Sequence, residues 1–410
     1  MRFDVFFSIC QNEIHGVTPN ERTMFENFFD QVQVADLLGF ETAWVAESHL
    51  SSEVQKQNRK PVIPNFRGEV GLNTDIAQLA LQVFSKTKNI GVGSAIKNIL
   101  CNGGPLAHAE SIRYCLSLHS LRAAEKRKLH VGFAAGRFDY SNRPYGVCPR
   151  NPMEEAAWPQ VKAKCFLEAV EIFCRALRGD VFSSEELGSQ GLLAHDFPNQ
   201  EAWDSACKIA ADLGIYTSDT QAIPIPHFWN FEKLRIIPKE APLDLLSLTL
   251  GSHDPRAQKL ANSILPCKVF NLSITPTKVI EETHLRMHEI FHPDGGPWKR
   301  EYMPRTVLIF LESNPHESVQ TQRARAKERA QKALEVYWEA VEGTLNPERI
   351  AQAVENSLYG CPQDVVEQIR ERFHPEDKLM LWFDFNCHDN EYVKESMRAF
   401  AEHVMPQFIN

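Results

Sequence analysis

Several patterns that would assign a chain to a class at once are missing from this sequence. Its ten cysteines contain no C-x-x-C pair, which argues against a zinc ribbon and against a dithiol redox site. No apolar stretch approaches the length of a membrane span. The N-terminal run from Met1 to Phe7 is interrupted by Asp4 and lacks a small-residue cleavage site, unlike a signal peptide. These absences predict a soluble, cytoplasmic protein whose cysteines are buried and reduced.

Positive charge is also nowhere concentrated. The net charge is −9, and no Lys/Arg cluster is interleaved with aromatic residues, which argues against nucleic acid as the main partner. The most basic stretches, 125–128 and 323–329, are typical of solvated helix surface. No G-x-G-x-x-G follows a predicted strand, so a nicotinamide site is not expected. The fifteen histidines include no H-x-H after the first strand, so the ligand spacing of a metal-dependent barrel hydrolase is missing.

The sequence does contain a regular alternation of short apolar runs and helical patterns. Of its 410 residues, 43% are hydrophobic and 24% charged, which allows a large buried core. Eight runs predict buried strands at 3–9, 42–46, 90–95, 129–134, 245–250, 268–272, 306–311 and 379–383. Helical periodicity lies between them, including 75–84, 106–121 and 154–178, with a closing helix at 391–404.

This alternation predicts the fold class. Strand and helix in strict succession indicate an α/β protein with a parallel sheet, and eight units permit closure into a single (β/α)8 TIM-like barrel over residues 1–410. A doubly wound open sheet is the alternative, because periodicity does not decide closure. Residues 180–243 interrupt the rhythm between strands four and five. Since long loops in compact domains are usually functional, we interpret this insertion as a lid over the barrel mouth.

Polar and small residues stand at the carboxyl ends of the predicted strands, where barrel active sites form. Glu47 and His49 follow the second strand, and the small residues of 91–95 and 131–136 end the third and fourth. Tyr140 lies in a polar aromatic cluster just beyond the fourth. A Gly251-Ser252 turn follows the fifth strand at the start of a helix, where backbone N–H groups and a hydroxyl can bind an anion such as phosphate.

These segments resemble a known family, the bacterial-luciferase-like, flavin-dependent monooxygenases. Residues 38–49 are similar to the family's Gly-Phe-Asp-x-x-Trp-x-x-Glu-His-His stretch, and 90–95, Pro105 with Ala109-Glu110, and 131–136 follow in the family's order. The tail resembles the family's ending at 360–366 and 396–406. Each piece is short, but their order and spacing together cover nearly the whole barrel.

The resemblance implies a cofactor and a reaction. It implies that reduced FMN, supplied by a separate flavin reductase, is used with O2 to oxygenate a small organic substrate. It places the phosphate near Gly251, Ser252 and His253, and the flavin ring near Ala95, Ile96 and Ala134. The Ala95–Ile96 peptide falls where the family often has a bulge or a non-proline cis bond.

The resemblance also implies roles for individual side chains, and leaves alternatives. Glu47 and His49 would polarise or protonate at the flavin edge, and Arg137 and Ser252 would hold the phosphate. Tyr140, His227 and Trp229 would line the substrate space. The alternatives are a deazaflavin (F420)-dependent oxidoreductase and a flavin-binding barrel without catalysis. The family resemblance further suggests a homodimer through barrel helices.

Two departures from the family pattern distinguish this sequence. Ser48 replaces the first histidine of the family's pair, which is the catalytic one in luciferases proper, so that only His49 matches. Ala135 corresponds to an arginine that helps to hold phosphate in luciferases, and Arg137 is the candidate substitute. In addition, 180–243 is longer than the corresponding part of the luciferase subunit, which predicts a different substrate pocket, and the substrate stays open.

Overall fold

A nine-stranded sheet forms the centre of the protein, which is described here by a computed structural model covering residues 1–58, 63–122, 124–188, 190–217, 221–343 and 345–408. Every strand pair in this sheet is parallel. The order is β10-β9-β11-β1-β2-β3-β4-β7-β8. The strands are β1 (Arg2–Phe7), β2 (Thr42–Val45), β3 (Gly91–Asn98), β4 (Leu129–Ala134), β7 (Leu246–Leu250), β8 (Cys267–Val269), β9 (Arg305–Leu311), β10 (Leu358–Gly360) and β11 (Lys378–Trp382). All eight sequence-predicted strands are present.

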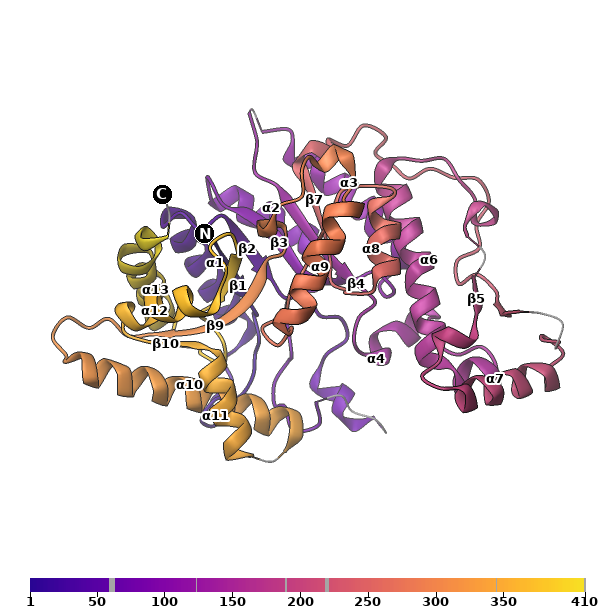
Figure 1. Cartoon of the computed structure of the whole chain (residues 1–410). Coiled ribbons are helices and arrows are strands. Elements are labelled where there is room, and N and C mark those ends of the chain that lie inside the picture. Colours follow the sequence, from indigo (N-terminus) through magenta and orange to yellow (C-terminus); the bar gives the residue numbers. More distant parts are fainter. Residues whose placement is uncertain (59–62, 123, 189, 218–220, 344, 409–410) are drawn as a thin grey trace.

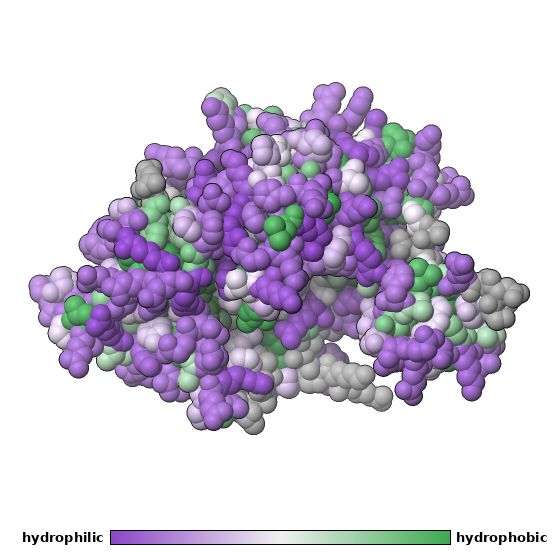
Figure 2. Space-filling view, viewed as in Figure 1, coloured by the Kyte–Doolittle hydropathy of each residue, from purple (hydrophilic) through white to green (hydrophobic). Residues whose placement is uncertain are grey.

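Helices cover the outer face of the sheet (Figure 1). The larger ones are α1 (Glu21–Leu37), α2 (Ile76–Lys86), α3 (Gly104–His119), α6 (Trp158–Arg178), α8 (Pro255–Asn262), α9 (Thr277–Ile290), α10 (Val319–Glu342), α11 (Pro347–Asn356), α12 (Pro362–Arg372) and α13 (Asn390–Ala399). In the described parts of the chain, no helix is long and apolar enough to cross a membrane. Figure 2 shows a largely hydrophilic face on which the hydrophobic residues are scattered.

The nine-stranded sheet is curled, and its closure into the eight-stranded ring that the sequence predicted stays a prediction. Asn271, two residues after β8, forms a parallel bridge with Arg305, the first residue of β9. There the Asn271 amide donates to the Pro304 carbonyl at 2.9 Å, and the Thr306 amide donates to the Asn271 carbonyl at 3.0 Å. Farther along β9, residues 309–311 pair with β10, which the sequence reading missed. β10 occupies the edge of β9 at residues 309–311, so only the first residues of β9 are left to pair with the segment after β8.

Side chains alternate between the two faces of the sheet, as a pleated strand requires. The outward residues, such as Val5, Val131 and Leu381, join the helices in one large apolar core. The inward residues Phe6, Trp44, Phe270 and Met380 form a second, smaller cluster. A Cβ at Gly93 would lie 2.5 Å from the Trp44 ring, so glycine in β3 makes room for this indole. The Trp44 Nε1–H donates to Asp4 at 2.7 Å deeper in the sheet.

The insertion at 180–243 forms a small unit beside the long helix α6, at the right of Figure 1. It contains β5 (Gln190–Leu192) and β6 (Ile223–Ile225), which pair antiparallel, and α7 (Gln200–Asp212). Trp203, Ile223 and their neighbours pack against Val161 of α6 and against α5 (Pro152–Ala156) in a cluster of their own. Positions 189 and 218–220 of the insertion lie outside the described residues.

Candidate active site

A cavity of about 470 Å³ lies where β2, β3, β4 and β7 end, and we call it the mouth cavity. This volume is within the range of roughly 300–1,000 Å³ that small-molecule sites usually have. A larger hollow around Arg2, Glu41 and Arg300 lies at the opposite end of the strands. The mouth cavity is lined by Glu47, Ser48, His49, Ile96, Lys97, Asn98, Ala134, Ala135, Gly136, Arg137, Phe138, Tyr140, Ser141, Phe166, Gly251 and Ser252.

The structure brings most of the sequence-predicted site residues together. Those in the lining are Glu47, His49, Ile96, Ala134, Arg137, Tyr140, Gly251 and Ser252. Four others are not in it. Ala95 lies under the cavity against the inward aromatic cluster, and His253 points to α9, where its Nδ1 is 3.1 Å from the Thr283 hydroxyl. His227 and Trp229 lie against α6, as described below.

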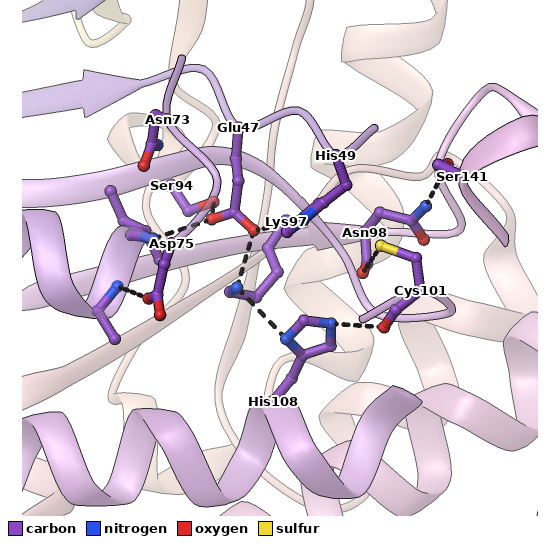
Figure 3. A network of polar contacts seen from close by, with 12 residues as sticks. Glu47, His49, Asn73, Asp75, Ser94, Lys97, Asn98, Cys101, His108 and Ser141 are labelled. Carbon is purple, nitrogen blue, oxygen red and sulfur yellow. Dashed lines mark hydrogen bonds and ion pairs between the residues drawn. The ribbon is translucent and has the colours of Figure 1, made fainter. Parts of the chain in front are cut away.

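Glu47 is the most constrained side chain of the site (Figure 3). Its carboxylate is fully buried. One oxygen, Oε1, lies 2.8 Å from Lys97 Nζ and 3.0 Å from His49 Nε2. The other, Oε2, accepts from the Ile76 amide at 3.3 Å and from the Ser94 hydroxyl at 3.5 Å. Burial raises the pKa of Glu47, but the charge of Lys97 and the hydrogen bonds from His49 and Lys97 outweigh it and bring that pKa to about 2. Glu47 is therefore a fixed anion rather than a proton donor.

His49 is the group of this pair that can exchange a proton. Because the Glu47 carboxylate only accepts hydrogen bonds, the Nε2 of His49 carries a proton and donates it to Oε1. The ring is then oriented by a carboxylate, an arrangement that also stabilises an imidazolium if Nδ1 takes up a second proton. The predicted role shared by Glu47 and His49 thus divides into an orienting anion and a proton carrier.

Lys97 and His108 complete this buried network, and the sequence reading missed both. The Lys97 ammonium lies between the Glu47 carboxylate and the Nδ1 of His108, which is 3.3 Å away. His108 Nε2 lies 3.0 Å from the carbonyl of Cys101. Burial and the charge of Lys97 lower the pKa of His108 to about 3, so its ring is neutral. The sequence did contain a signal for Lys97, because a lysine directly follows a strand end that otherwise consists of small and apolar residues.

The floor of the cavity is built from small residues and from a backbone irregularity. The Ala95–Ile96 peptide is cis, as the family resemblance implied, and the β3–β4 register shifts between Ser94 and Lys97. Gly251 lies directly against this segment, since a Cβ there would be 2.4 Å from Ile96 Cδ1 and 3.3 Å from Ala134 Cβ. The ends of β3, β4 and β7 therefore converge on one spot.

The cavity rim carries groups that suit an anion. Arg137 is exposed, lies 5.4 Å over the Phe138 ring and has no carboxylate partner among the described residues. The Ser252 hydroxyl accepts from the Asp254 amide at 3.2 Å, which leaves its own proton free to donate. Tyr140, whose hydroxyl contacts Ser48, also borders the cavity, and burial raises its pKa.

The segment 226–229 is tied to the outer helices instead of the cavity. The Phe228 and Trp229 amides donate to Glu168 of α6 at 3.1 and 3.2 Å, and Arg150 donates to the carbonyls of Pro226 and His227. The Trp229 indole packs on the first turn of α3 at Gly104. None of the described residues of 180–243 lines the mouth cavity. One residue of the insertion, Asp196, pairs with Lys164 and with Arg256, and Arg256 also pairs with Asp254, two residues after Ser252.

No family model and no curated protein sequence matches the chain. Solved structures do match. Monooxygenase RslO1 from Streptomyces bottropensis has a TM-score of 0.64 at 16% identity, with all of both chains covered. The oxygenating constituent of 3,6-diketocamphane monooxygenase from Pseudomonas putida, in complex with FMN, has a TM-score of 0.58 at 13% identity, covering 100% of this chain and 99% of that one.

A third match carries a different cofactor. An F420-dependent secondary alcohol dehydrogenase, in complex with an F420-acetone adduct, has a TM-score of 0.51 at 13% identity, with all of both chains covered. At such identities the likeness concerns the fold. The chain has the fold of luciferase-like monooxygenases, and the resemblance to that family drawn from the sequence is confirmed at this level.

Proposed function

We propose that this protein is a flavin-dependent monooxygenase that takes reduced FMN from a separate reductase and uses O2 to oxygenate a small organic substrate. One observation carries the proposal: His49, the cis Ala95–Ile96 segment, Ala134 and the Gly251-Ser252 corner surround a single cavity. Reduced flavin supplies the electrons that activate O2 when it is bound. The same fold occurs among the structural neighbours in a monooxygenase and in an oxygenating enzyme constituent in complex with FMN.

The residues present fit such a cofactor. Ile96, Ala134 and Gly251 offer a flat, small-sided floor for a planar ring, and Arg137 and Ser252 offer a cation and a hydroxyl to a phosphate. His49 would hold or release a proton at Nδ1, with Glu47 fixing its ring. Tyr140, Phe138 and Phe166 would exclude water and border the substrate. His227 and Trp229 act on the substrate only if the insertion moves as the predicted lid.

A deazaflavin-dependent oxidoreductase is the second candidate, favoured by the F420 complex among the structural neighbours. Its reaction moves hydride without O2, so the same residues would face a different ring. A flavin-binding protein without catalysis is the third, motivated by Ser48 in place of the family's first histidine.

Three further features complete the proposal. We propose the eight predicted strands as the family's barrel, with β10 as an added edge. We propose a cytoplasmic location, supported by ten free cysteines, which suit a reducing compartment. We also propose a homodimer. Tyr114, Leu118 and Leu121 are exposed along α3 and just after it at helical spacing, with 58%, 36% and 79% of their surface accessible.

The test is to titrate the whole protein anaerobically with oxidised FMN, reduced FMN and F420, following fluorescence and absorbance. We expect reduced FMN to bind most tightly, and Arg137→Gln to weaken this binding about tenfold, as loss of a charged contact to phosphate should. Arg143→Gln, which removes an exposed arginine outside the cavity, is the matched control.

The outcomes separate the candidates. Oxygen uptake by the flavin-loaded protein with a reductase and a substrate panel supports the monooxygenase. Preference for F420 without oxygen uptake supports the second candidate, and tight oxidised FMN without turnover supports the third. Absence of binding to any flavin in either redox state contradicts the proposal as a whole.

A further inference from the structure

Lys97 is a buried cation for which the proposed chemistry assigns no role. Only 3% of its side chain is exposed. An ammonium taken out of water is costly unless it is paired and hydrogen-bonded. Figure 3 shows it at the centre of the polar network, between Glu47 of the loop after β2 and His108 of α3. The position therefore calls for a reason beyond packing.

The hydrogen bonds around Lys97 determine where its protons point. The Cys101 carbonyl can only accept, so His108 carries its proton on Nε2 and presents the bare Nδ1 to Lys97. One Lys97 proton is directed to His108 at 3.3 Å and another to Glu47 Oε1 at 2.8 Å. Neutral His108 thus orients the ammonium toward Glu47 and adds no negative charge of its own next to Lys97.

Glu47 Oε1 is shared between Lys97 and His49. Both nitrogens lie within 3.0 Å of this one oxygen. The positive charge of Lys97 partly neutralises the carboxylate, which weakens the attraction of Glu47 for a second proton on His49. Without the Lys97 ammonium, the full negative charge of Glu47 would favour the imidazolium form of His49.

We propose that Lys97 is a positioning residue that acts on His49 through Glu47 and sets how tightly His49 holds a proton. Its use in catalysis rests on the proposed function, whereas its effect on His49 does not. The titratable and charged groups around His49 are Glu47 on its own loop, Lys97 of β3, His108 of α3, Cys101, and Tyr140 and Arg137 across the cavity.

The experiment measures the titration of His49 itself in the full chain. Histidine labelled with ¹³C is followed by NMR from pH 4 to 9, and the His49 signal is assigned with His49→Gln. In Lys97→Gln we expect the His49 midpoint to move up by about one pH unit or more, the effect of removing one nearby charge. Lys97→Arg, which keeps the charge, should restore most of the wild-type midpoint.

Lys378→Gln is the matched control. Lys378 is also a lysine with carboxylate partners, 3.3 Å from Asp4 and 2.8 Å from Glu41; it is half-buried and lies at the amino end of β11, away from the mouth. We expect its loss to leave His49 unchanged. A His49 midpoint that stays at the wild-type value in Lys97→Gln, or one that moves equally in Lys97→Arg, overturns the proposal.

A second pair of variants serves if Lys97→Gln does not fold. His108→Asp places a competing carboxylate on the other side of the ammonium and should also raise the His49 midpoint, whereas His108→Gln, which keeps a neutral acceptor, should not. Equal midpoints in these two variants would contradict the proposal. Because the NMR measurement needs no flavin or substrate, it remains valid even if the proposed function is wrong. A matching shift in the pH profile of oxygen uptake would connect the effect of Lys97 on His49 with the proposed monooxygenase reaction.

Discussion

The carboxylate of Glu47 receives four hydrogen-bond donors, and each favours its charged form. A buried charge with this many partners stabilises the fold as long as all partners remain. The donors come from the loop after β2, from β3 and from the first turn of α2. Glu47 therefore joins three elements under the cavity as well as orienting His49.

This arrangement predicts a defined dependence of stability on acid. The pKa of Glu47 falls from 4.5 to about 2 on folding, so its contribution is complete above pH 4.5 and is lost as the pH falls toward 2. This pKa shift corresponds to a contribution of Glu47 to the free energy of unfolding on the order of 3 kcal/mol. Urea unfolding at pH 2 to 6 should show this loss in the wild type.

Glu47→Gln should be less stable than the wild type at pH 6 by about 3–5 kcal/mol, because it leaves the Lys97 charge buried and unpaired. The gap between the two proteins should narrow as the pH falls. A gap that stays constant between pH 6 and 2 would contradict the assignment of Glu47 as an ionised group.

Recognition of these residues from sequence depended on their neighbours along the chain. Glu47 and His49 follow a clear strand directly, so their place at the mouth could be predicted. Lys97 could not, because the strand was expected to end at Ala95, whereas β3 continues past its cis peptide to Asn98. His108 lies within a helix whose periodicity marks it as an ordinary core position.

At the level of elements, the segment 226–229 depends on one acid of α6. Glu168 is almost fully buried, and burial raises its pKa while the Phe228 and Trp229 amides and His227 lower it. Glu168→Ala would leave these amides without an acceptor, at a cost of about 1–3 kcal/mol. We expect faster hydrogen exchange at Phe228 and Trp229, measured by mass spectrometry.

Glu171→Ala is the control for this prediction, since Glu171 lies one turn farther along α6 and pairs with Arg175 instead. Exchange at residues 228 and 229 should not change in it. Unaltered protection in Glu168→Ala would contradict this dependence on Glu168. If the insertion acts as a lid, Glu168→Ala should in addition speed flavin entry, which stopped-flow fluorescence would detect.

The strands of the sheet were predictable because each is a short, buried and mostly apolar run bounded by polar residues. The strands that the sequence did not predict, β5, β6 and β10, have three residues each, too few for a period to be read. The pairing between β8 and β9 was hard to predict for a related reason. The segment expected as a strand at 268–272 pairs with β7 at 267–269 and with β9 through the bridge at Asn271, and β10 pairs with residues 309–311 of β9.

For the whole molecule, the exposed stripe on α3 predicts association. Light scattering with size exclusion should give twice the 46.7 kDa of one chain. Replacing Leu118 and Leu121 by glutamate should yield monomers, because charges would be buried against their own symmetry copies. Leu285→Glu changes an exposed leucine of α9 and should remain dimeric. A monomeric wild type at micromolar concentration would rule out this dimer.

The sequence by itself determined the class of the fold and the end of the sheet at which the candidate site residues gather. Hydrophobic period and polar strand ends are local properties, and parallel strands place their carboxyl ends together wherever the chain leads. Only the tertiary structure decided which polar groups meet there. It paired Lys97 with Glu47 and His108, placed Gly251 against Ile96, and kept His227 and Trp229 out of the cavity. Such contacts depend on how segments far apart in the chain approach each other, which no local pattern encodes.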